Sequence, residues 1–298
     1  MRAMVLALVL AWTLAAQPRG PAAEFEEANR LAAAGQLDEA IGLYERLAAA
    51  YPGNLNVLSN LGIAEYKSER YQAAASHFRS VLRLAPDSFI GKLFLGGSLL
   101  KQGDAAAAIP YLEQAVAAQP ADRNARGLLG DAMLAAGRPK DAAVQWRAAL
   151  DRTPGDDSLR RKLVLAFYDA NDTAAGLRIA KEALEARPAS AEWQFLYGAG
   201  LLEAQQIAQA ISHLEQAIKL NPALVDAHAA LGRAWLEAGD PEKAIPQLQL
   251  GLEGDTDGSR HYQLARALQA VGRKDEAAAA LRKYESIRRT APATPGKP

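Results

Sequence analysis

Six prolines of this chain follow one another at uninterrupted steps of 34 residues. They are Pro52, Pro86, Pro120, Pro154, Pro188 and Pro222. A fixed period of this length is typical of repeat architectures, in which each unit packs only on its neighbours. Because proline ends a helix and turns the chain, each of these residues is expected to close one unit before the next begins. The chain is therefore predicted to be an array of helical units.

Other residues recur in the same frame. Counting back from the prolines places repeat starts at 21, 55, 89, 123, 157, 191 and 225, with an eighth start one residue early at Gly258. Position 8 of a repeat is mostly Gly or Ala, position 20 is mostly Ala, and position 24 is bulky in seven of the eight units. Small residues let two antiparallel helices approach closely. A glycine at position 15, as in Gly35 and Gly239, predicts the end of the first helix.

Composition and motifs exclude several classes of function. The 34 Lys and Arg residues balance the 34 Asp and Glu residues, so no bulk basic field is present to attract nucleic acid. The chain has no cysteine, which excludes disulfides, thiolate catalysis and cysteine-ligated metals. Motifs of hydrolases, zinc peptidases and nucleotide-binding loops are absent. We therefore predict a non-enzymatic protein with no catalytic, cofactor-binding or metal-binding residues.

Residues 1–16 have the pattern of a secretory signal peptide. Arg2 supplies a positive start, and the stretch from Ala3 to Ala16 is apolar apart from Thr13. Fourteen residues are too few to cross about 30 Å of hydrocarbon as a helix, so cleavage is favoured over a retained anchor. We expect an exported protein, in a bacterial periplasm or secreted, with no stable membrane span after cleavage. A short linker is expected over 17–20.

The recurring residues resemble the tetratricopeptide repeat family. The pattern is Leu-Gly at positions 7 and 8, Ala at 20, a bulky residue at 24 and Pro at 32, and it extends over residues 21–289. The resemblance implies an all-α fold, a right-handed superhelical solenoid of antiparallel helix pairs whose first helices line a concave groove. Repeats 1–7 then occupy 21–257. Repeat 8, at 258–289, acts as the C-terminal cap, and 290–298 are expected to form a disordered tail.

The resemblance also implies which side chains face the groove, namely positions 2, 5, 9, 12 and 13 of the first helices. Position 12 is apolar or aromatic in six successive repeats, and position 13 changes from lysine to carboxylate along the chain. One interpretation is partial burial between neighbouring helices. The other is a groove for an extended or helical peptide, with apolar anchors and a charge gradient that orients it. The candidate groove residues are Phe25, Asn29, Tyr66, Lys67, Leu100, Lys101, Leu134, Tyr168, Asp169, Phe195, Leu202, Glu203, Leu236, Glu237 and Tyr262.

One binding mode known in the resembled family is not expected here. Chaperone-binding members hold a C-terminal carboxylate with two asparagines and three basic residues. Asn29 and Asn60 match the asparagine places. Phe25, Ile90 and Phe94 stand where the basic residues would be, so the clamp is incomplete.

Repeat 5 departs from the pattern. It has Gly176 at position 20 and Ala180 at position 24, and its turn lacks glycine. Phe167 and Tyr168 are expected to refill the lost volume. The alternative is a weak junction at which the two halves of the array flex.

Two further features are interpreted as structural. The four histidines are spread by the repeat geometry, so they are expected to pack rather than to bind metal. The stretch from Glu253 to Gly258 is similar to the first half of a calcium loop, but Leu264 stands where the twelfth-position Glu is required. A solvated connection is the favoured interpretation.

These observations favour a scaffold or adaptor outside the cytoplasm, which binds a protein or peptide of unknown identity and no nucleic acid. An alternative is a self-associating structural component of an envelope assembly, and hence a homo-oligomer. A more remote alternative is an accessory subunit of an envelope enzyme or of a secretion or assembly complex.

Overall fold

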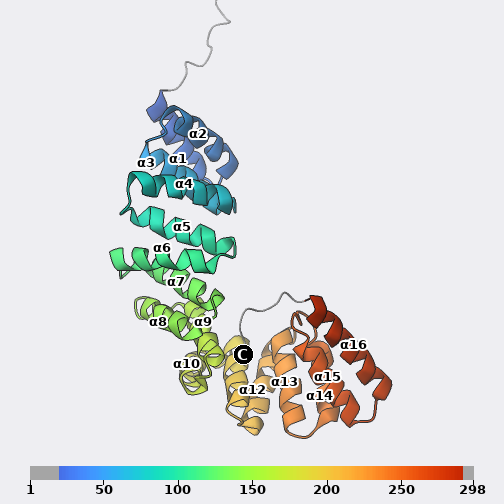
Figure 1. Ribbon diagram of the computed structural model, residues 1–298. Coiled ribbons are helices and arrows are strands. Elements are labelled where there is room, and N and C mark those ends of the chain that lie inside the picture. The colour runs from blue at the N-terminus through green and yellow to red at the C-terminus, as the bar shows by residue number, and fades with distance from the viewer. Residues whose placement is uncertain (1–19, 291–298) are drawn as a thin grey trace, which may run out of the picture. The chain divides into compact units, whose positions relative to one another are not determined.

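The computed structural model describes residues 20–290, a range that contains sixteen α-helices and no strand (Figure 1). The helices are α1 (Pro21–Ala33), α2 (Leu37–Ala50), α3 (Leu55–Lys67), α4 (Tyr71–Leu84), α5 (Phe89–Lys101), α6 (Ala105–Ala118), α7 (Arg123–Ala135), α8 (Pro139–Leu150), α9 (Asp157–Asp169), α10 (Thr173–Ala186), α11 (Ala191–Glu203), α12 (Ile207–Leu220), α13 (Val225–Glu237), α14 (Pro241–Leu250), α15 (Ser259–Ala270) and α16 (Lys274–Thr290). The predicted all-α fold of consecutive helix pairs is confirmed. The predicted signal peptide, and the predicted tail beyond Thr290, lie outside the described residues.

The helices belong to two compact units, whose boundary falls between Ala132 and Met133, inside α7. In the first unit each helix from α1 to α6 packs on the next, and the first helices α1, α3 and α5 also contact one another in sequence. In the second unit consecutive packing runs from α8 to α16, and α13 contacts both α11 and α15. We call the side formed by the first helices the inner face of each unit.

Close packing within a pair depends on the small residue at position 8. A Cβ atom placed on Gly62 would lie 2.8 Å from the Phe78 ring, and one on Gly96 would lie 2.6 Å from the Leu112 side chain. Both large side chains occupy position 24 and are fully buried. A larger residue at position 8 would therefore displace the side chain that fills the pair.

The turn after the first helix is left-handed at position 15 in all eight repeats. Five repeats use glycine there: Gly35, Gly103, Gly137, Gly239 and Gly272. The predicted helix-ending role of these glycines is confirmed. Glu69, Asn171 and Gln205 adopt the same conformation, with φ of 63°, 58° and 58°. The sequence did not indicate that these three residues bear backbone strain.

The six prolines at position 32, which recur at steps of 34 residues and are called the ladder prolines below, also link one repeat to the next. In repeats 4 to 7 the side chain at position 4 meets the carbonyl oxygen of the preceding ladder proline, which helps to satisfy the end of the second helix. Arg126 donates to Pro120 at 2.7 Å, and the Nε2 of His228 lies 3.0 Å from the Pro222 carbonyl. The Nδ1 of His228 is bound by Gln247 at 2.7 Å. The structural role expected of this histidine is confirmed.

Both ends of the array are polar. Position 7 is Leu or Tyr in seven repeats and Glu27 in the first, and position 10 is small in seven repeats and Arg30 in the first. Glu27 and Arg30 form an ion pair at 2.6 Å on α1. On α16, position 28 is Glu285, whereas the other seven repeats have an aliphatic residue there. Such substitutions give the outer face of a terminal repeat its contact with water.

Tyr168 fills the space that the small residues of repeat 5 leave open. A Cβ atom on Gly176 would lie 2.3 Å from the Tyr168 ring, and the hydroxyl of Tyr168 donates to the carbonyl oxygen of Leu196 at 3.0 Å. Burial raises the pKa of this hydroxyl well above its ordinary value. Phe167 does not share the role, since it lines a surface cavity. The weak-junction alternative stays a prediction.

Candidate functional site

The fifteen candidate residues differ widely in exposure. Seven are exposed: Lys67, Lys101, Leu134, Asp169, Glu203, Glu237 and Tyr262. Seven are half-buried: Phe25, Asn29, Tyr66, Leu100, Tyr168, Phe195 and Leu236. Leu202 is buried in the core of the second unit.

The predicted row of apolar and aromatic side chains at position 12, called the apolar ladder below, is therefore interrupted. Leu202 is 2% exposed and packs in a cluster with Leu214 and Leu231. Tyr66 is held edge-on between two rings, with centroids 5.5 Å from Tyr71 and 5.3 Å from Phe94. The side chain at position 12 lies where one repeat packs on the following one. Its exposure therefore depends on the size of the neighbouring side chains in that following repeat. Part of the ladder packs helices together, as the first interpretation held.

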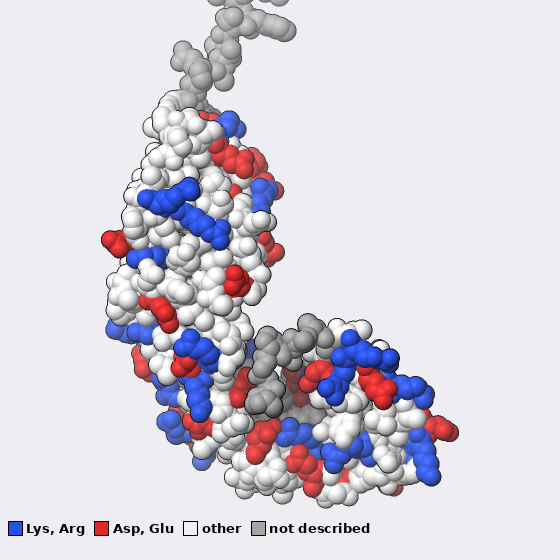
Figure 2. Space-filling view, viewed as in Figure 1, with Lys and Arg blue, Asp and Glu red and all other residues white. Residues whose placement is uncertain are grey.

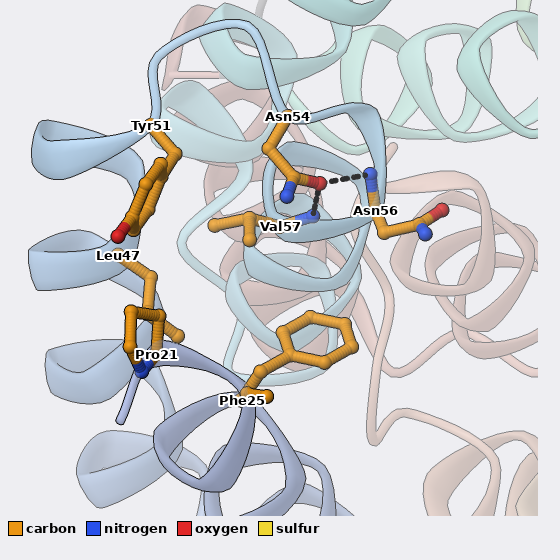
Figure 3. Close-up of a pocket in the computed structure, with 8 residues that line it drawn as sticks. Pro21, Phe25, Leu47, Tyr51, Asn54, Asn56 and Val57 are labelled. Atoms are coloured by element: carbon orange, nitrogen blue, oxygen red, sulfur yellow. Dashed lines mark hydrogen bonds between the residues drawn. The ribbon is translucent and has the colours of Figure 1, made fainter. Parts of the chain in front are cut away.

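The first unit has a cavity at the start of the array, beside the beginnings of the first helices α1 and α3 (Figure 3). Its volume is about 370 Å³, and it lies between the beginning of α1, the end of α2 and the beginning of α3. The side chains of Phe25, Leu47 and Val57 supply an apolar lining, with Pro21 at its edge. Tyr51 also lines the cavity and is 45% exposed. An apolar concavity with few polar groups is the usual form of a binding pocket.

Asparagines form the polar side of this cavity. The Oδ1 of Asn54 accepts the backbone N–H groups of Asn56 and Val57, at 3.1 and 3.2 Å, and so caps α3. Figure 3 shows these two bonds next to the apolar lining. The carboxamide of Asn56 belongs to an exposed residue at the cavity.

Asn29 and Asn60 do not form the carboxylate clamp of the resembled family. The Oδ1 of Asn29 accepts the Tyr44 hydroxyl at 2.7 Å and the amide of Asn60 at 2.8 Å. Burial raises the pKa of the Tyr44 hydroxyl, which keeps it a donor. Phe94, in one of the basic places, stacks on another ring at 5.4 Å. The two asparagines join the first two repeats.

The exposed charges at position 13 have opposite signs in the two units. Lys67 ends α3 and Lys101 ends α5 in the first unit, and both are exposed. In the second unit Arg233 binds Glu203 at 2.6 Å and Glu237 at 3.1 Å. These two carboxylates are thus partly neutralised, and the lysines give the first unit the clearer charge.

The connection before α15 is more ordered than expected. The prediction of a solvated connection was wrong for Asp255, because only 1% of its side chain is exposed. One Asp255 oxygen accepts the His261 backbone N–H at 3.0 Å and lies 2.6 Å from its Nδ1. Arg260 donates to the carbonyls of Gly251 and Glu253, at 2.9 and 2.8 Å. A guanidinium therefore occupies the carbonyls that a cation would need. Over residues 20–290, no three His, Cys, Asp or Glu side chains converge as metal ligands would.

No helix in the described part of the chain has the length and apolar character needed to cross a membrane.

Comparison with known proteins gives a consistent family. Family profiles described as tetratricopeptide repeat match residues 7–55, 25–89, 93–157, 201–264 and 259–290. The Hsp70-Hsp90 organizing protein of Triticum aestivum is 32% identical over 111 residues, which are 37% of this chain and 19% of that protein. The chain thus matches about a fifth of the length of that relative.

Solved structures show the same fold. MamA of Desulfovibrio magneticus is 26% identical, with a TM-score of 0.53 over 55% of this chain and 93% of that one. The C-terminal part of a TPR repeat-containing protein from Cytophaga hutchinsonii is 16% identical, with a TM-score of 0.64 over 83% and 99%. A tetratricopeptide repeat protein from Parabacteroides merdae is 13% identical, with a TM-score of 0.61 over 83% and 98%.

Proposed function

Because the chain belongs to the tetratricopeptide repeat family, we propose that it works as a non-enzymatic scaffold that binds a segment of another protein on the inner face of its first unit. The observation that carries this proposal is the apolar cavity of about 370 Å³ beside exposed amides. A family fold alone does not define a function, so the site must carry the argument.

The inner face of the first unit supplies the elements that recognition of a peptide needs. The cavity at Phe25 and Tyr51 accepts one apolar side chain, which is the anchor. Asn56 bonds the backbone of the bound segment. Lys67 and Lys101 stand exposed on the following first helices, so they attract carboxylates and set the direction of binding. The partner in this proposal is a protein or peptide with an apolar anchor.

Charge reversal tests the proposal without disturbing the core. The double variant Lys67→Glu/Lys101→Glu changes two exposed side chains and is expected to lose proteins that crosslink to the wild-type chain in its native cell extract. The control Arg79→Glu/Arg83→Glu reverses two exposed charges on α4 of the same unit and is expected to retain them. If quantitative mass spectrometry found the crosslinked proteins equally with both variants, the inner face would not be the binding surface.

We also propose that the protein is exported, on the strength of the signal-like pattern of residues 1–16. The mature chain is expected in the periplasmic or secreted fraction, with its N-terminus after Ala15, Ala16 or Ala23. Deleting residues 2–16 should retain the chain in the cytoplasm. Detection of the full-length N-terminus by mass spectrometry, in a chain that stays in the cytoplasm, would contradict this location.

A further inference from the structure

A second cavity lies in the second unit, among residues that the proposed inner-face site does not use. It has a volume of about 570 Å³ and lies between α8, the end of α9 and the turn before α10. Ala143, Val144 and Ala148 of α8 line it, together with Phe167 and Ala170 at the end of α9. The lining is therefore mainly apolar, and it is open to water.

Val144 departs from the repeat pattern at a position where packing of the helices does not require an apolar side chain. It occupies position 22 of its repeat and is 62% exposed. The other seven repeats have Gly42, Ser76, Pro110, Arg178, Ser212, Pro246 and Ala279 at this position. A branched aliphatic side chain left in water at an otherwise small or polar position gives the array no core contact.

Phe167 is the second departure. Position 11 is buried in six of the other repeats, whereas Phe167 is half-buried and lines the cavity. Trp235, at the same position in repeat 7, is half-buried too, but the ammonium group of Lys243 covers its ring at 4.3 Å. The two departures from the pattern, Val144 and Phe167, therefore meet in one cavity.

The cationic side of the cavity comes from α8. Lys140 precedes Val144 by four residues and Arg147 follows it by three, so all three lie on one helical face. Within residues 20–290, neither cation forms an ion pair. Figure 2 shows Lys and Arg side chains over the region of α8–α10.

Two carboxylates complete the rim. Asp172 accepts the backbone N–H of Ala175 at 3.2 Å as the cap of α10, so the start of that helix offsets its charge. Asp151 follows the end of α8. With Asp172 offset in this way, the charges left on the rim are the two cations that flank Val144, Lys140 and Arg147, and the single carboxylate of Asp151 beyond the end of α8.

We propose that this cavity is a second docking site, which binds an apolar side chain of a partner segment that carries carboxylates on both flanks. The apolar side chain fills the space between Val144 and Phe167. The flanking carboxylates pair with Lys140 and Arg147, whose spacing along α8 matches one helical turn on either side. The site lies off the inner face, so one chain could hold two partners at once.

A defined probe tests the site directly. It is a fluorescent alanine-based peptide with one central leucine and glutamates three and four residues to either side, titrated with the full mature chain. Saturable binding is expected, and it should weaken about tenfold or more in Val144→Asp and in Lys140→Glu/Arg147→Glu. Two controls should bind as the wild type does: Ser212→Asp, which places a charge at position 22 of α12, and Lys67→Glu/Lys101→Glu on the inner face.

Several results would overturn the proposal. These are no saturable binding by the wild-type chain, equal binding of a peptide with lysines in place of the glutamates, and unchanged binding by folded Val144→Asp. Loss of self-association on Val144→Asp in sedimentation, without any peptide binding, would identify a second copy as the occupant instead. Since Val144 is exposed, circular dichroism should show wild-type helicity for its variant. The outcome is separate from that of the inner-face experiment, which uses different residues.

Discussion

Single residues are most informative in this chain where they break the repeat pattern. Ser98 occupies position 10, which is Ala or Gly in the other internal repeats. It is fully buried, and its hydroxyl has no hydrogen-bond partner within the described residues. A buried polar group without a partner costs about 1–3 kcal/mol of stability. The helix contact at this position therefore tolerates the serine but gains nothing from it.

Replacing this serine should stabilise the protein. Ser98→Ala is expected to raise the free energy of unfolding by about 1 kcal/mol, because it removes the unsatisfied hydroxyl and keeps the small size. The reverse change at the same position of repeat 7, Ala234→Ser, should lower it by a similar amount. Urea unfolding measures both. A lower midpoint for Ser98→Ala would show that the hydroxyl has a partner.

The left-handed residues give a second test at this scale. Gln205→Gly is expected to stabilise the protein by about 0.5–1 kcal/mol, because the strain of φ 58° exceeds the entropy that glycine adds to the unfolded chain. Asn171→Gly should gain less, since asparagine tolerates this conformation. Thermal unfolding of the two variants compares them. No gain for Gln205→Gly would place the strain elsewhere.

At the scale of helices, two histidines at the same repeat position have opposite environments. The Nδ1 of His77 lies 2.8 Å from Glu65, a carboxylate with 3% of its side chain exposed, and this bond raises the pKa of His77 above 6.5. His213 faces the neutral amide of Gln194 at 2.7 Å, and burial lowers its pKa below 6.5. The histidine of α4 thus has a carboxylate of α3 as its partner, whereas the histidine of α12 has a neutral amide of α11.

These shifts predict opposite pH dependence. The contribution of His77 to stability is complete below pH 6.5 and is lost as the pH rises through its raised pKa. The contribution of His213 is present above pH 6.5 and is lost as the pH falls through its lowered pKa. Relative to the wild type, His77→Gln should therefore lose more stability at pH 5.5 than at pH 8.5, and His213→Gln should lose less. Unfolding of both variants at the two pH values is the measurement, and a shared sign would contradict the assignment.

At the scale of the whole molecule, the sequence predicted what depends on the repeat itself. The prolines and the pairing of positions 8 and 24 are local, and each helix pair packs by the same contacts, so the all-α array followed. The site was less predictable because exposure depends on neighbours. The sequence predicted that Tyr168 refills the volume lost in repeat 5, but it did not predict that this side chain also packs against Gly200 of the next repeat. The cavity at Val144 needs a side chain from the next repeat, which a repeat position does not show.

The polar ends determine whether the array grows. Glu27 and Arg30 stand where the other repeats present apolar or small residues to the preceding helix. Glu27→Leu/Arg30→Ala restores that surface, and it is expected to cause concentration-dependent association in sedimentation, which the wild type should lack. The control Glu39→Leu/Arg46→Ala changes exposed residues of α2 and should stay like the wild type. Association of the wild-type chain through its ends would instead favour a self-associating component.

The central claim is that a partner segment lies on the inner face of the first unit. The most direct test is a photocrosslinking amino acid placed at Lys67, with the same group at Arg79 on α4 as the matched exposed control, in the native cell. A specific crosslinked protein is expected from position 67 and not from position 79. It should disappear when Ala22→Trp fills the cavity at the other end of α3, because one bound segment is proposed to contact both places. Crosslinks of equal yield from both positions, or crosslinks that Ala22→Trp leaves unchanged, would contradict the claim.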